Sequence, residues 1–325
     1  MTPRGPVLAR LDRPRAPNTR LAVVADPHDA DGHEGTWKVY HRTADRFAAA
    51  LEDAAAVDAD AVVVPGDLTR DGRPEEFERV DALLAACDRP LVAVPGNHDV
   101  PKATDAHETP PVAAFGDRYA DGGFPVVREV GGLTVVGVNT AGAAGRLTET
   151  HEGGLTADQL ARVDDALADA REAVVVGHHP LAGAARHESA VSPAPLHPPM
   201  AAADDLTAIL ARHDVPLAVT GHNHWPSLAD LGGTWELAAP AACSLPPTML
   251  VLDVTPSGTT VSLVPLADRD GLEEAYRHAA AGSERSRAIA ERVAAGHLDA
   301  MPFVDCHGGP ETSHAAALAR SGIVD

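Results

Sequence analysis

Residues 61–69 read AVVVPGDLT, an apolar and β-branched run followed by Gly66 and Asp67. Such a run is typical of a strand, so Asp67 stands directly after a strand end. Four other segments place residues with cation-binding oxygen or nitrogen atoms after an apolar run in the same way. They are Asp26-Pro27-His28, Gly96-Asn97-His98-Asp99, Gly177-His178-His179-Pro180 and Gly221-His222-Asn223-His224. Because open α/β sheets bind ligands at the ends of their strands, the five segments predict one shared site.

The first third of the chain alternates apolar runs with segments of helical periodicity. A strand at 21–25 comes before a helix at about 41–57, and the strands 61–64 and 91–94 enclose a second helix that begins near Pro74. This alternation predicts parallel strands joined by right-handed crossovers.

The middle of the chain predicts a second set of strands. The runs 126–130 and 133–138, separated by Gly131-Gly132, indicate a hairpin. Thr156 is a typical N-cap for a helix at about 156–171. Further strands and helices are expected at 174–176, 203–213 and 217–220, followed by an antiparallel meander at 235–237, 249–254 and 259–264. Two facing sheets, each covered by helices on its outer side, account for this order.

The two ends of the chain differ in composition from the rest. Residues 1–20 are rich in proline and arginine and are predicted to form an N-terminal arm without regular structure. Residues 21–266 are expected to form the metal-binding domain, and residues 267–325 a mainly helical C-terminal extension. We expect this extension to pack on the main domain or on a second copy of the chain, which would give a homo-oligomer. Its helices are expected at 268–295, with an interruption at Gly282, and at 314–320.

Charge is the unusual bulk property of the chain. It has 47 acidic and 26 basic residues, a formal net charge of −21, and Lys38 and Lys102 as its two lysines. Dense carboxylates keep a surface hydrated in high salt, and salt screens their mutual repulsion, so we interpret the excess as adaptation to a halophilic, salt-rich habitat. An ordinary acidic cytoplasmic protein is the alternative. A negative field repels anionic membranes and the nucleic-acid backbone, so neither membranes nor long nucleic acids are expected partners.

The salt-adapted interpretation predicts that salt stabilises the fold. Self-repulsion within a chain of net charge −21 destabilises the compact state at low ionic strength and fades as counterions screen it. We therefore expect the melting temperature to rise between dilute buffer and molar KCl. A melting temperature that is flat or falls over that range would contradict the interpretation.

Cysteine usage indicates a reducing compartment. The three cysteines, Cys87, Cys243 and Cys306, have no paired spacing, which argues for free thiols. The N-terminus lacks the apolar segment of a signal peptide, and no run is long enough to cross a bilayer. We expect a cytoplasmic protein.

The strand-end residues are those that a two-metal hydrolase needs. Phosphate esters resist hydrolysis because their charge repels a nucleophile and their leaving oxygen is poor. Two cations about 3.5–4 Å apart meet both difficulties, since they activate a bridging hydroxide and neutralise charge on the phosphoryl oxygens. Asp67 is the natural bridging ligand because it is the one carboxylate at the end of a central strand.

The spacing of the other candidate ligands along the chain indicates which of them can share a cation. Asp26 and His28 are separated by one residue, so both can reach a single cation from an extended turn. His222 and His224 have the same spacing and can serve different cations or share one. The amide oxygen of Asn97 is a further ligand, and the remaining candidate is His178, which completes the second set. His179 is interpreted as an orienting or packing residue.

These segments resemble, in order and kind, the calcineurin-like metallophosphoesterase superfamily over about residues 21–266. Within that region, Gly66-Asp67-Leu68-Thr69, Asn139-Thr140 and His178-His179-Pro180 are similar to the class III cyclic nucleotide phosphodiesterase branch. The resemblance implies an α/β fold, a four-layer α-β-β-α sandwich of two mixed sheets flanked by helices. This expectation agrees with the two sheets deduced from the strand pattern.

The resemblance also implies roles for single residues. One metal would be held by Asp26, His28, Asp67 and His224, and the other by Asp67, Asn97, His178 and His222. His98 would be the acid that protonates the leaving oxygen, with Asp99 as its orienting partner.

The residues and the resemblance together predict a dinuclear metal-dependent phosphoesterase that hydrolyses a phosphodiester, either a cyclic nucleotide or another small diester. A phosphomonoesterase or a nuclease with the same site is one alternative. A catalytically silent scaffold is another, although the intact Asn97-His98-Asp99 counts against it. The mixed nitrogen and oxygen ligands suit Mn, Fe, Zn or Co, as divalent or trivalent ions. Substrate specificity is expected to lie in the loops 30–40, 102–124 and 181–200.

Overall fold

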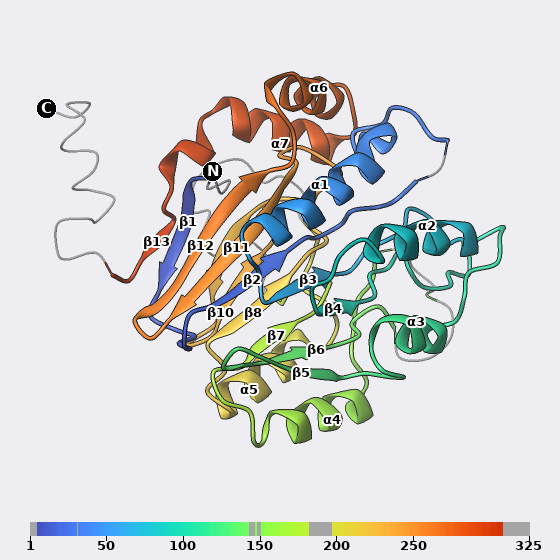
Figure 1. The fold of residues 1–325 in the computed structure, drawn as a ribbon. Coiled ribbons are helices and arrows are strands. Elements are labelled where there is room, and N and C mark those ends of the chain that lie inside the picture. Colours follow the sequence, from blue (N-terminus) through green and yellow to red (C-terminus); the bar gives the residue numbers. More distant parts are fainter. Residues whose placement is uncertain (1–4, 31, 143–146, 148–150, 182–196, 308–325) are drawn as a thin grey trace, which may run out of the picture.

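Two β-sheets face each other in the computed structural model, which describes residues 5–30, 32–142, 147, 151–181 and 197–307 (Figure 1). The first sheet consists of β1 (Val7–Leu11), β2 (Thr19–Val23), β3 (Ala61–Pro65), β4 (Leu91–Val94), β11 (Thr248–Thr255), β12 (Gly258–Pro265) and β13 (Val304–Asp305). The second consists of β5 (Val126–Val130), β6 (Leu133–Gly137), β7 (Val174–Val176), β8 (Leu217–Thr220), β9 (Ser227–Asp230) and β10 (Trp235–Ala238). Among the described residues, the strand orders are β13-β1-β12-β11-β2-β3-β4 and β5-β6-β7-β8-β10-β9.

Helices cover both outer faces of this pair of sheets (Figure 1). The helices α1 (Thr43–Ala56), α2 (Pro74–Leu84) and α3 (Val112–Tyr119) lie on the first sheet, and α4 (Ala157–Leu167) and α5 (Ala203–Arg212) lie on the second. Two more helices, α6 (Arg269–Ala280) and α7 (Glu284–Ala294), follow the last long strand. The expected helix start at Thr156 is confirmed, since its hydroxyl accepts the N–H of Gln159 at 3.3 Å in a capping box.

Alternate residues of the strands point to different layers, as the twofold period of a strand requires. Leu21, Val23 and Val63 belong to the core between the sheets. Ala22 and Val62, one residue along, pack with the helices on the outer face of the first sheet. A matching outer core joins the second sheet to α4 and α5. The fold is therefore the four-layer α-β-β-α sandwich that the sequence predicted.

The strands that carry the five segments run parallel within each sheet. β2, β3 and β4 pair in parallel, with α1 and α2 as their crossovers, and so do β7 and β8. The predicted parallel pairing is confirmed. Since all of these strands point the same way within their sheet, the residues that follow them gather at one edge.

The predicted antiparallel meander at 235–264 was wrong. Of the three predicted strands, β11 and β12 do form an antiparallel pair in the first sheet, whereas β10 lies in the second sheet, parallel to β8 and antiparallel to β9. The chain crosses from one sheet to the other directly after β10. Ala239 donates its N–H to Thr220 beside β8, and Ala242 donates to Ala25 beside β2. Local pattern cannot reveal this change of sheet, because all three segments have the same strand periodicity.

The prediction that residues 1–20 lack regular structure was also wrong. β1 pairs antiparallel with β12 and parallel with β13, and its Leu8 and Leu11 are fully buried. The prolines and arginines around β1 hide the pattern of a short strand whose partners lie about 250 to 300 residues away in the chain. The helix after Thr156 is shorter than expected and ends at Leu167.

The described part of the C-terminal extension packs on the body of the protein. The predicted helices interrupted at Gly282 are confirmed as α6 and α7. Their Ala275 and Ile289 form one buried apolar cluster with Val39 and Trp225. The helical patch expected at 314–320 lies outside the described residues.

An ionic contact links this helical pair to the loop before α1. Glu274 of α6 lies 3.0 Å from Nε2 of His41 and 3.0 Å from Nε of Arg42. These two partners, His41 first, hold the pKa of Glu274 at about 2, below its ordinary value of 4.5. A carboxyl whose pKa falls on folding stabilises the fold above its unfolded pKa, and this contribution is lost as the pH falls toward the folded pKa.

We therefore expect the stabilising effect of Glu274 to depend on pH. The melting temperature of Glu274→Gln should lie below that of the wild type near neutral pH, and the difference should shrink as the pH falls below 4.5. Glu273→Gln removes the same charge from a side chain that is 61% exposed and serves as the matched control. A difference for Glu274→Gln that stays constant down to pH 3 would contradict the expectation.

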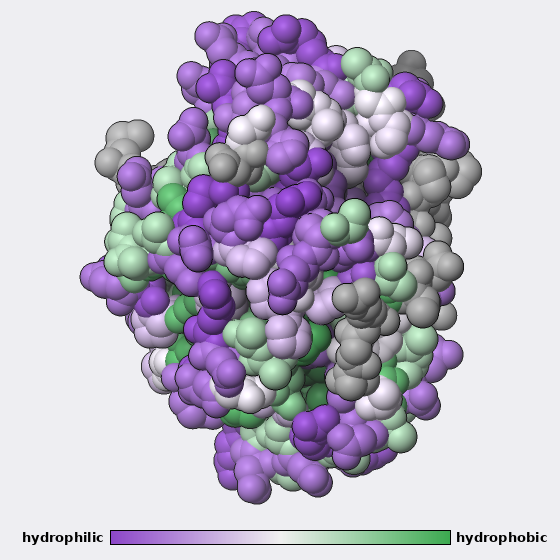
Figure 2. Space-filling model, turned by 90° about the vertical axis from the view of Figure 1, so that its right-hand side faces the viewer, coloured by the Kyte–Doolittle hydropathy of each residue, from purple (hydrophilic) through white to green (hydrophobic). Residues whose placement is uncertain are grey.

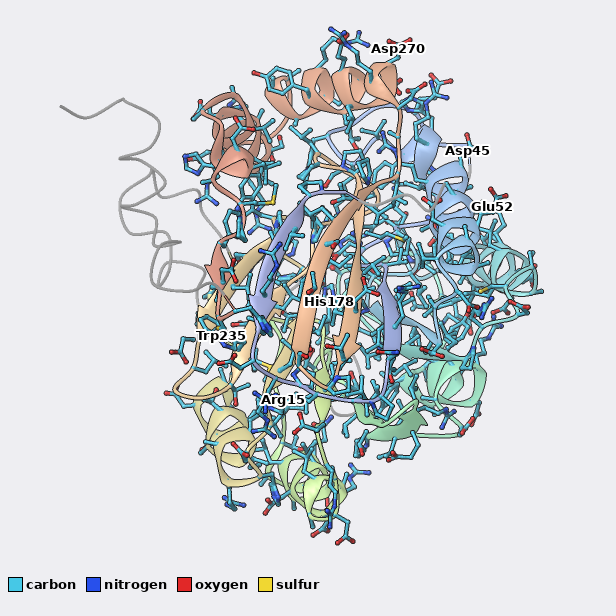
Figure 3. All side chains as sticks on the ribbon, turned by 60° about the vertical axis from the view of Figure 1, so that its left-hand side comes forward. Arg15, Asp45, Glu52, His178, Trp235 and Asp270 are labelled. Atoms are coloured by element: carbon cyan, nitrogen blue, oxygen red, sulfur yellow. The ribbon has the colours of Figure 1, made fainter. Side chains whose placement is uncertain are left out.

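The surface is mainly hydrophilic. Asp45 and Glu52 on α1 and Asp270 on α6 point outward, whereas His178 lies in the interior (Figure 3). The face in Figure 2 is dominated by hydrophilic residues, with hydrophobic ones gathered in its lower half. Among the described residues, no helix has the length and apolar character needed to span a membrane.

Candidate metal centre

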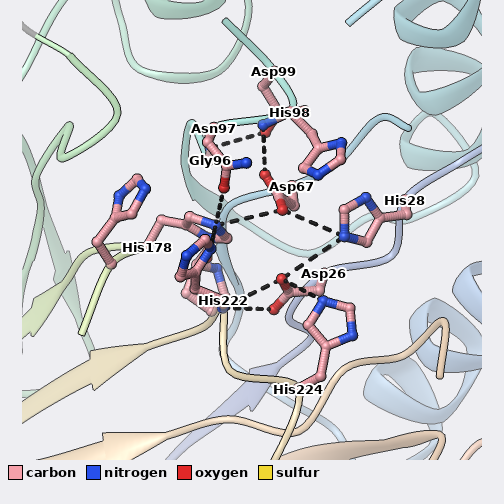
Figure 4. Close-up of polar contacts among 12 residues, drawn as sticks. Asp26, His28, Asp67, Gly96, Asn97, His98, Asp99, His178, His222 and His224 are labelled. Atoms are coloured by element: carbon pink, nitrogen blue, oxygen red, sulfur yellow. Dashed lines mark hydrogen bonds and ion pairs between the residues drawn. The ribbon is translucent and has the colours of Figure 1, made fainter. Parts of the chain in front are cut away.

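The seven residues predicted to bind metal lie together at one edge of the sandwich (Figure 4). Each side chain is at most 3% exposed. Four of them follow strands of the first sheet: Asp26 and His28 come after β2, Asp67 after β3 and Asn97 after β4. The other three follow strands of the second sheet: His178 comes after β7, and His222 and His224 after β8. Residues far apart in the chain are thus joined in one buried cluster.

The Asp67 carboxylate lies between two groups of donors. Its Oδ2 is 3.3 Å from Nε2 of His28 and 3.4 Å from Nε2 of His178. On the His28 side, Oδ1 of Asp26 is 3.9 Å from Nε2 of His28 and 3.3 Å from Nε2 of His224. The first group therefore contains two carboxylates and two imidazoles.

The second group forms around His178. Nε2 of His178 is 3.1 Å from Oδ1 of Asn97 and 3.1 Å from Nδ1 of His222. With Oδ2 of Asp67 at 3.4 Å, one carboxylate, one amide oxygen and two imidazoles face a common point. Asp67 is the one residue shared with the first group.

Neighbouring oxygen atoms decide which imidazole nitrogen faces the centre. A ring whose Nδ1–H donates to an oxygen keeps the lone pair on Nε2, which is the usual arrangement of metal-binding histidines. Three of the rings follow this rule: His28 has Nδ1 3.2 Å from the carbonyl of Thr69, His178 has it 2.8 Å from the carbonyl of Pro65, and His224 has it 2.8 Å from the hydroxyl of Ser244.

The backbone at the site is unusual. Five of the seven predicted ligands have left-handed backbone conformations, which are uncommon for residues other than glycine and concentrate at functional sites. They are Asp26, His28, Asp67, His222 and His224. Two glycines allow this crowding: a Cβ at Gly96 would lie 2.1 Å from Oδ1 of Asp67, and one at Gly221 would lie 2.7 Å from Oδ2 of Asp26. Glycine is thus needed at both positions, because a side chain there would collide with a carboxylate of the centre.

Burial and neighbouring charges set the protonation states of the proposed ligands. Burial lowers the pKa of His28, His222 and His224, which leaves these rings neutral with a lone pair available. Burial opposes ionisation of Asp67, but His178, His98 and His28 together outweigh it and hold the pKa of Asp67 well below its ordinary value. In the same pair, burial is outweighed by Asp67, which raises the pKa of His178 to about 9. A cation that binds there must therefore displace a proton from His178.

His98 lies at the rim of the centre and is partly exposed. Its backbone N–H donates to Oδ1 of Asp67 at 2.9 Å, and its Nδ1 is 2.5 Å from the carbonyl of Arg70. The prediction that Asp99 orients His98 was therefore wrong, because the backbone carbonyl of Arg70 is the partner of Nδ1 of His98.

Asp99 supports the Asp67 loop instead. Its carboxylate accepts the N–H groups of Leu68, Thr69 and Gly96 at 2.9 to 3.1 Å, and the Thr69 hydroxyl at 2.8 Å. Among the hydrogen bonds of the described residues, none joins Asp99 to the ring of His98. Asp99 is thus a buried positioning residue that fixes the turn carrying Asp67.

Sequence reasoning missed two lysines as residues of this site. Lys38 places Nζ 3.0 Å from Nε2 of His28 and 3.4 Å from Nε2 of His98. Lys102 donates to the carbonyls of Asn97, His98 and Val100 at 3.4 to 3.5 Å. A signal was present: Lys38 and Lys102 are the two lysines of a chain whose other basic residues are arginines.

Histidines beyond the predicted ligands line the second group. His179 has Nδ1 2.9 Å from the Thr140 hydroxyl, and its ring centroid is 4.7 Å from that of His222. The ring of His197 lies closer to His222, at 3.8 Å, and that of His151 at 6.0 Å. The side of the centre next to His222 is therefore rich in imidazole.

Comparison with known proteins identifies the family. A family model described as calcineurin-like phosphoesterase matches residues 19–226, which include all five strand-end segments. The chain belongs to this family. Like its relatives, this phosphoesterase is a metal-dependent hydrolase of phosphoric esters.

Individual relatives of this phosphoesterase agree with that placement. A probable cyclic nucleotide phosphodiesterase of Synechococcus sp. is 25% identical over 241 residues, which cover 71% of this chain and 86% of the relative. A glycerophosphodiester phosphodiesterase of Enterobacter lignolyticus is 52% identical over 40 residues, which are 12% of this chain and 14% of that protein. The crystal structure of a dimetal phosphatase from Danio rerio is 16% identical and has a TM-score of 0.54, covering 77% of this chain and 100% of the other. This last likeness concerns the fold alone.

The residues of this phosphoesterase fit two cations. Each donor group combines carboxylate or amide oxygen with two imidazole nitrogens, a mixture that suits first-row transition metals. Both groups are buried, and the carboxylate of Asp67 is within reach of both. A shared carboxylate between two mixed donor groups is the arrangement that a dinuclear centre requires.

Proposed function

We propose that the chain hydrolyses a small phosphodiester at a dinuclear transition-metal centre. One cation would be held by Asp26, His28, Asp67 and His224, and the other by Asp67, Asn97, His178 and His222. The observation that carries the proposal is the place of Asp67, whose Oδ2 lies 3.3 Å from one donor group and 3.4 Å from the other. When bound, the two cations would activate water and neutralise charge on the phosphoryl oxygens.

His98 is proposed to supply the proton for the leaving oxygen. Its side chain is partly exposed, whereas all seven proposed ligands are buried, so it is accessible to a substrate above the centre. The carbonyl of Arg70 holds Nδ1 and leaves Nε2 directed to the site. Burial, and then the charge of Lys38, lower the pKa of His98 to about 3. A phosphate anion beside the ring acts in the opposite direction, because a nearby negative charge favours the protonated imidazole.

A diester is favoured over other phosphoric esters by the relatives. The relative that matches most of this chain is named as a probable cyclic nucleotide phosphodiesterase, and the shorter match is named as a glycerophosphodiester phosphodiesterase. The net charge of −21 counts against long nucleic acids as substrates, because it repels their backbone. A phosphomonoesterase with the same centre is the second candidate.

Metal content and ester preference test the proposal together. Protein loaded with Mn, Fe, Zn or Co is expected to hold close to two ions per chain by elemental analysis. The loaded protein should have a higher kcat/KM for bis-p-nitrophenyl phosphate than for p-nitrophenyl phosphate, and cyclic nucleotides should be tested beside them. Binding of Mg or Ca alone, or of no ion, would contradict the dinuclear centre. A preference for the monoester would favour the second candidate.

We infer a reducing, cytoplasmic location from the thiols. Cys87, Cys243 and Cys306 are all free. Cys243 is buried beside the centre, with Sγ 3.8 Å from Nδ1 of His224. A thiol kept reduced next to a metal ligand is consistent with a reducing compartment. Fractionation of the source cells would test this inference.

A further inference from the structure

Lys38 reaches into the centre although neither donor group needs a lysine. Its ammonium donates to Nε2 of His28 at 3.0 Å and to Nε2 of His98 at 3.4 Å. A protonated lysine has three donors and no acceptor, so it cannot itself bind a cation. Its place between a proposed ligand and the proposed acid is where the phosphoryl group of a substrate would lie.

The backbone around Lys38 is held in an unfavourable conformation. Thr36 has φ 57° and Val39 has φ 47°, both in the left-handed region. A β-branched residue such as Val39 rarely adopts this conformation, and it persists only where the surroundings impose it. Val39 is fully buried, so the chain on both sides of Lys38 is fixed and the direction of the side chain is set.

The C-terminal helices supply the surroundings that impose this conformation. Val39 packs in one buried cluster with residues of α6 and α7. The turn between these helices touches the same loop, since a Cβ at Gly282 would lie 2.8 Å from Cβ of Trp37. The ring of Trp37 in turn lies 4.9 Å from the ring of His224. The extension thus holds the Trp37-Lys38 loop against the centre.

A second positive side chain reaches the same rim. Arg285, in the first turn of α7, is partly exposed and lies three residues after Gly282. Burial lowers the pKa of Arg285 to about 10, and the charge of Asp26 opposes that shift. The guanidinium is therefore within electrostatic reach of a proposed metal ligand. Its charge also acts on Lys38, so two positive side chains lie near this rim in a chain of net charge −21.

Cation binding would change what Lys38 contacts. A cation on Nε2 of His28 takes the lone pair to which Lys38 donates in this structure. The ammonium then lies beside a second positive charge, and the two repel each other. An anionic oxygen placed between them removes the repulsion and accepts a charge-assisted hydrogen bond. The geometry thus favours an anion next to Lys38 once cations are bound.

We propose that Lys38 is a substrate-binding residue that donates a hydrogen bond to a non-bridging oxygen of the phosphoryl group. The inference rests on the proposed function, because it places that group between the two cations and His98. Lys38, in the loop 30–40, would thus anchor the phosphoryl group of every substrate of the enzyme.

Binding of inorganic phosphate to the metal-loaded protein tests the proposal without turnover. Calorimetry is expected to show that Lys38→Met weakens phosphate binding by about 10- to 100-fold, the usual loss for a charge-assisted hydrogen bond. Lys38→Arg should keep most of the affinity. Arg162→Met removes the same charge from a side chain of α4 that is 53% exposed, and it should leave the affinity unchanged. All three variants should hold as many metal ions as the wild type.

The outcomes separate this proposal from the proposed function. Unchanged phosphate affinity in Lys38→Met, with both ions bound, would overturn the role of Lys38 and leave the dinuclear centre intact. Loss of ions in Lys38→Met would overturn it as well, because Lys38 would then support the ligands. Lys38→Gln serves as the second neutral variant if the methionine variant does not fold. Failure of the wild type to hold two ions or to cleave esters would instead overturn the proposed function.

Discussion

Replacing Asp67 by alanine is expected to abolish ester hydrolysis through loss of bound metal. Oδ2 of Asp67 lies between Nε2 of His28 and Nε2 of His178, at 3.3 and 3.4 Å, so one side chain serves both donor groups. Its removal deprives each proposed cation of a ligand, and the centre keeps no other carboxylate between them. We expect fewer than two ions per chain and activity at background on every ester, good or poor leaving group alike. Elemental analysis and turnover of the same preparation measure both effects.

Two variants make the Asp67 result specific. Asp45→Ala removes the same charge from an exposed position on α1 (Figure 3) and should change neither metal content nor turnover. Asp67→Asn keeps the size of the side chain and tests whether the negative charge itself is needed. Two firmly bound ions in Asp67→Ala would mean that the groups around His28 and His178 bind metal independently, which would contradict the bridging role.

The site could be predicted because its ligands are neighbours of strands in the chain. Asp67, His178 and His222 each lie two positions after the last residue of a strand, so local pattern and the rule that strand ends share an edge were sufficient. The orienting partner of His98 could not be found in this way. It is the backbone carbonyl of Arg70, and every residue has a carbonyl, so no residue type marks it.

Long-range pairing explains what the sequence did not reveal in the fold. β1 pairs with β12 and β13, which lie at the other end of the chain, and the chain passes from the second sheet to the first between β10 and β11. The pairing of β1 and the change of sheet after β10 both depend on contacts between distant parts of the chain, which local pattern does not encode. Lys38 is similar: its loop has no periodicity, and its direction is imposed by helices that begin at Arg269.

Replacing His98 by alanine is expected to separate proton transfer from metal binding. The contact of His98 with Asp67 is made by its backbone N–H, which alanine retains, so metal content should stay close to that of the wild type. Loss of the ring removes the proposed proton donor. Turnover on a diester with a poor leaving group should therefore fall by about 10²–10⁴-fold, the usual share of general acid catalysis.

The leaving group provides the decisive comparison for His98. A p-nitrophenolate ion leaves without being protonated, so His98→Ala should lose much less activity on bis-p-nitrophenyl phosphate than on an alkyl diester. A ligand would affect both substrates equally, because it acts on the cations and not on the leaving oxygen. Equal losses on the two esters, or loss of metal in His98→Ala, would therefore mean that His98 binds a cation or supports the ligands and is not the proton donor. A catalytically silent scaffold would have no activity to lose on either ester.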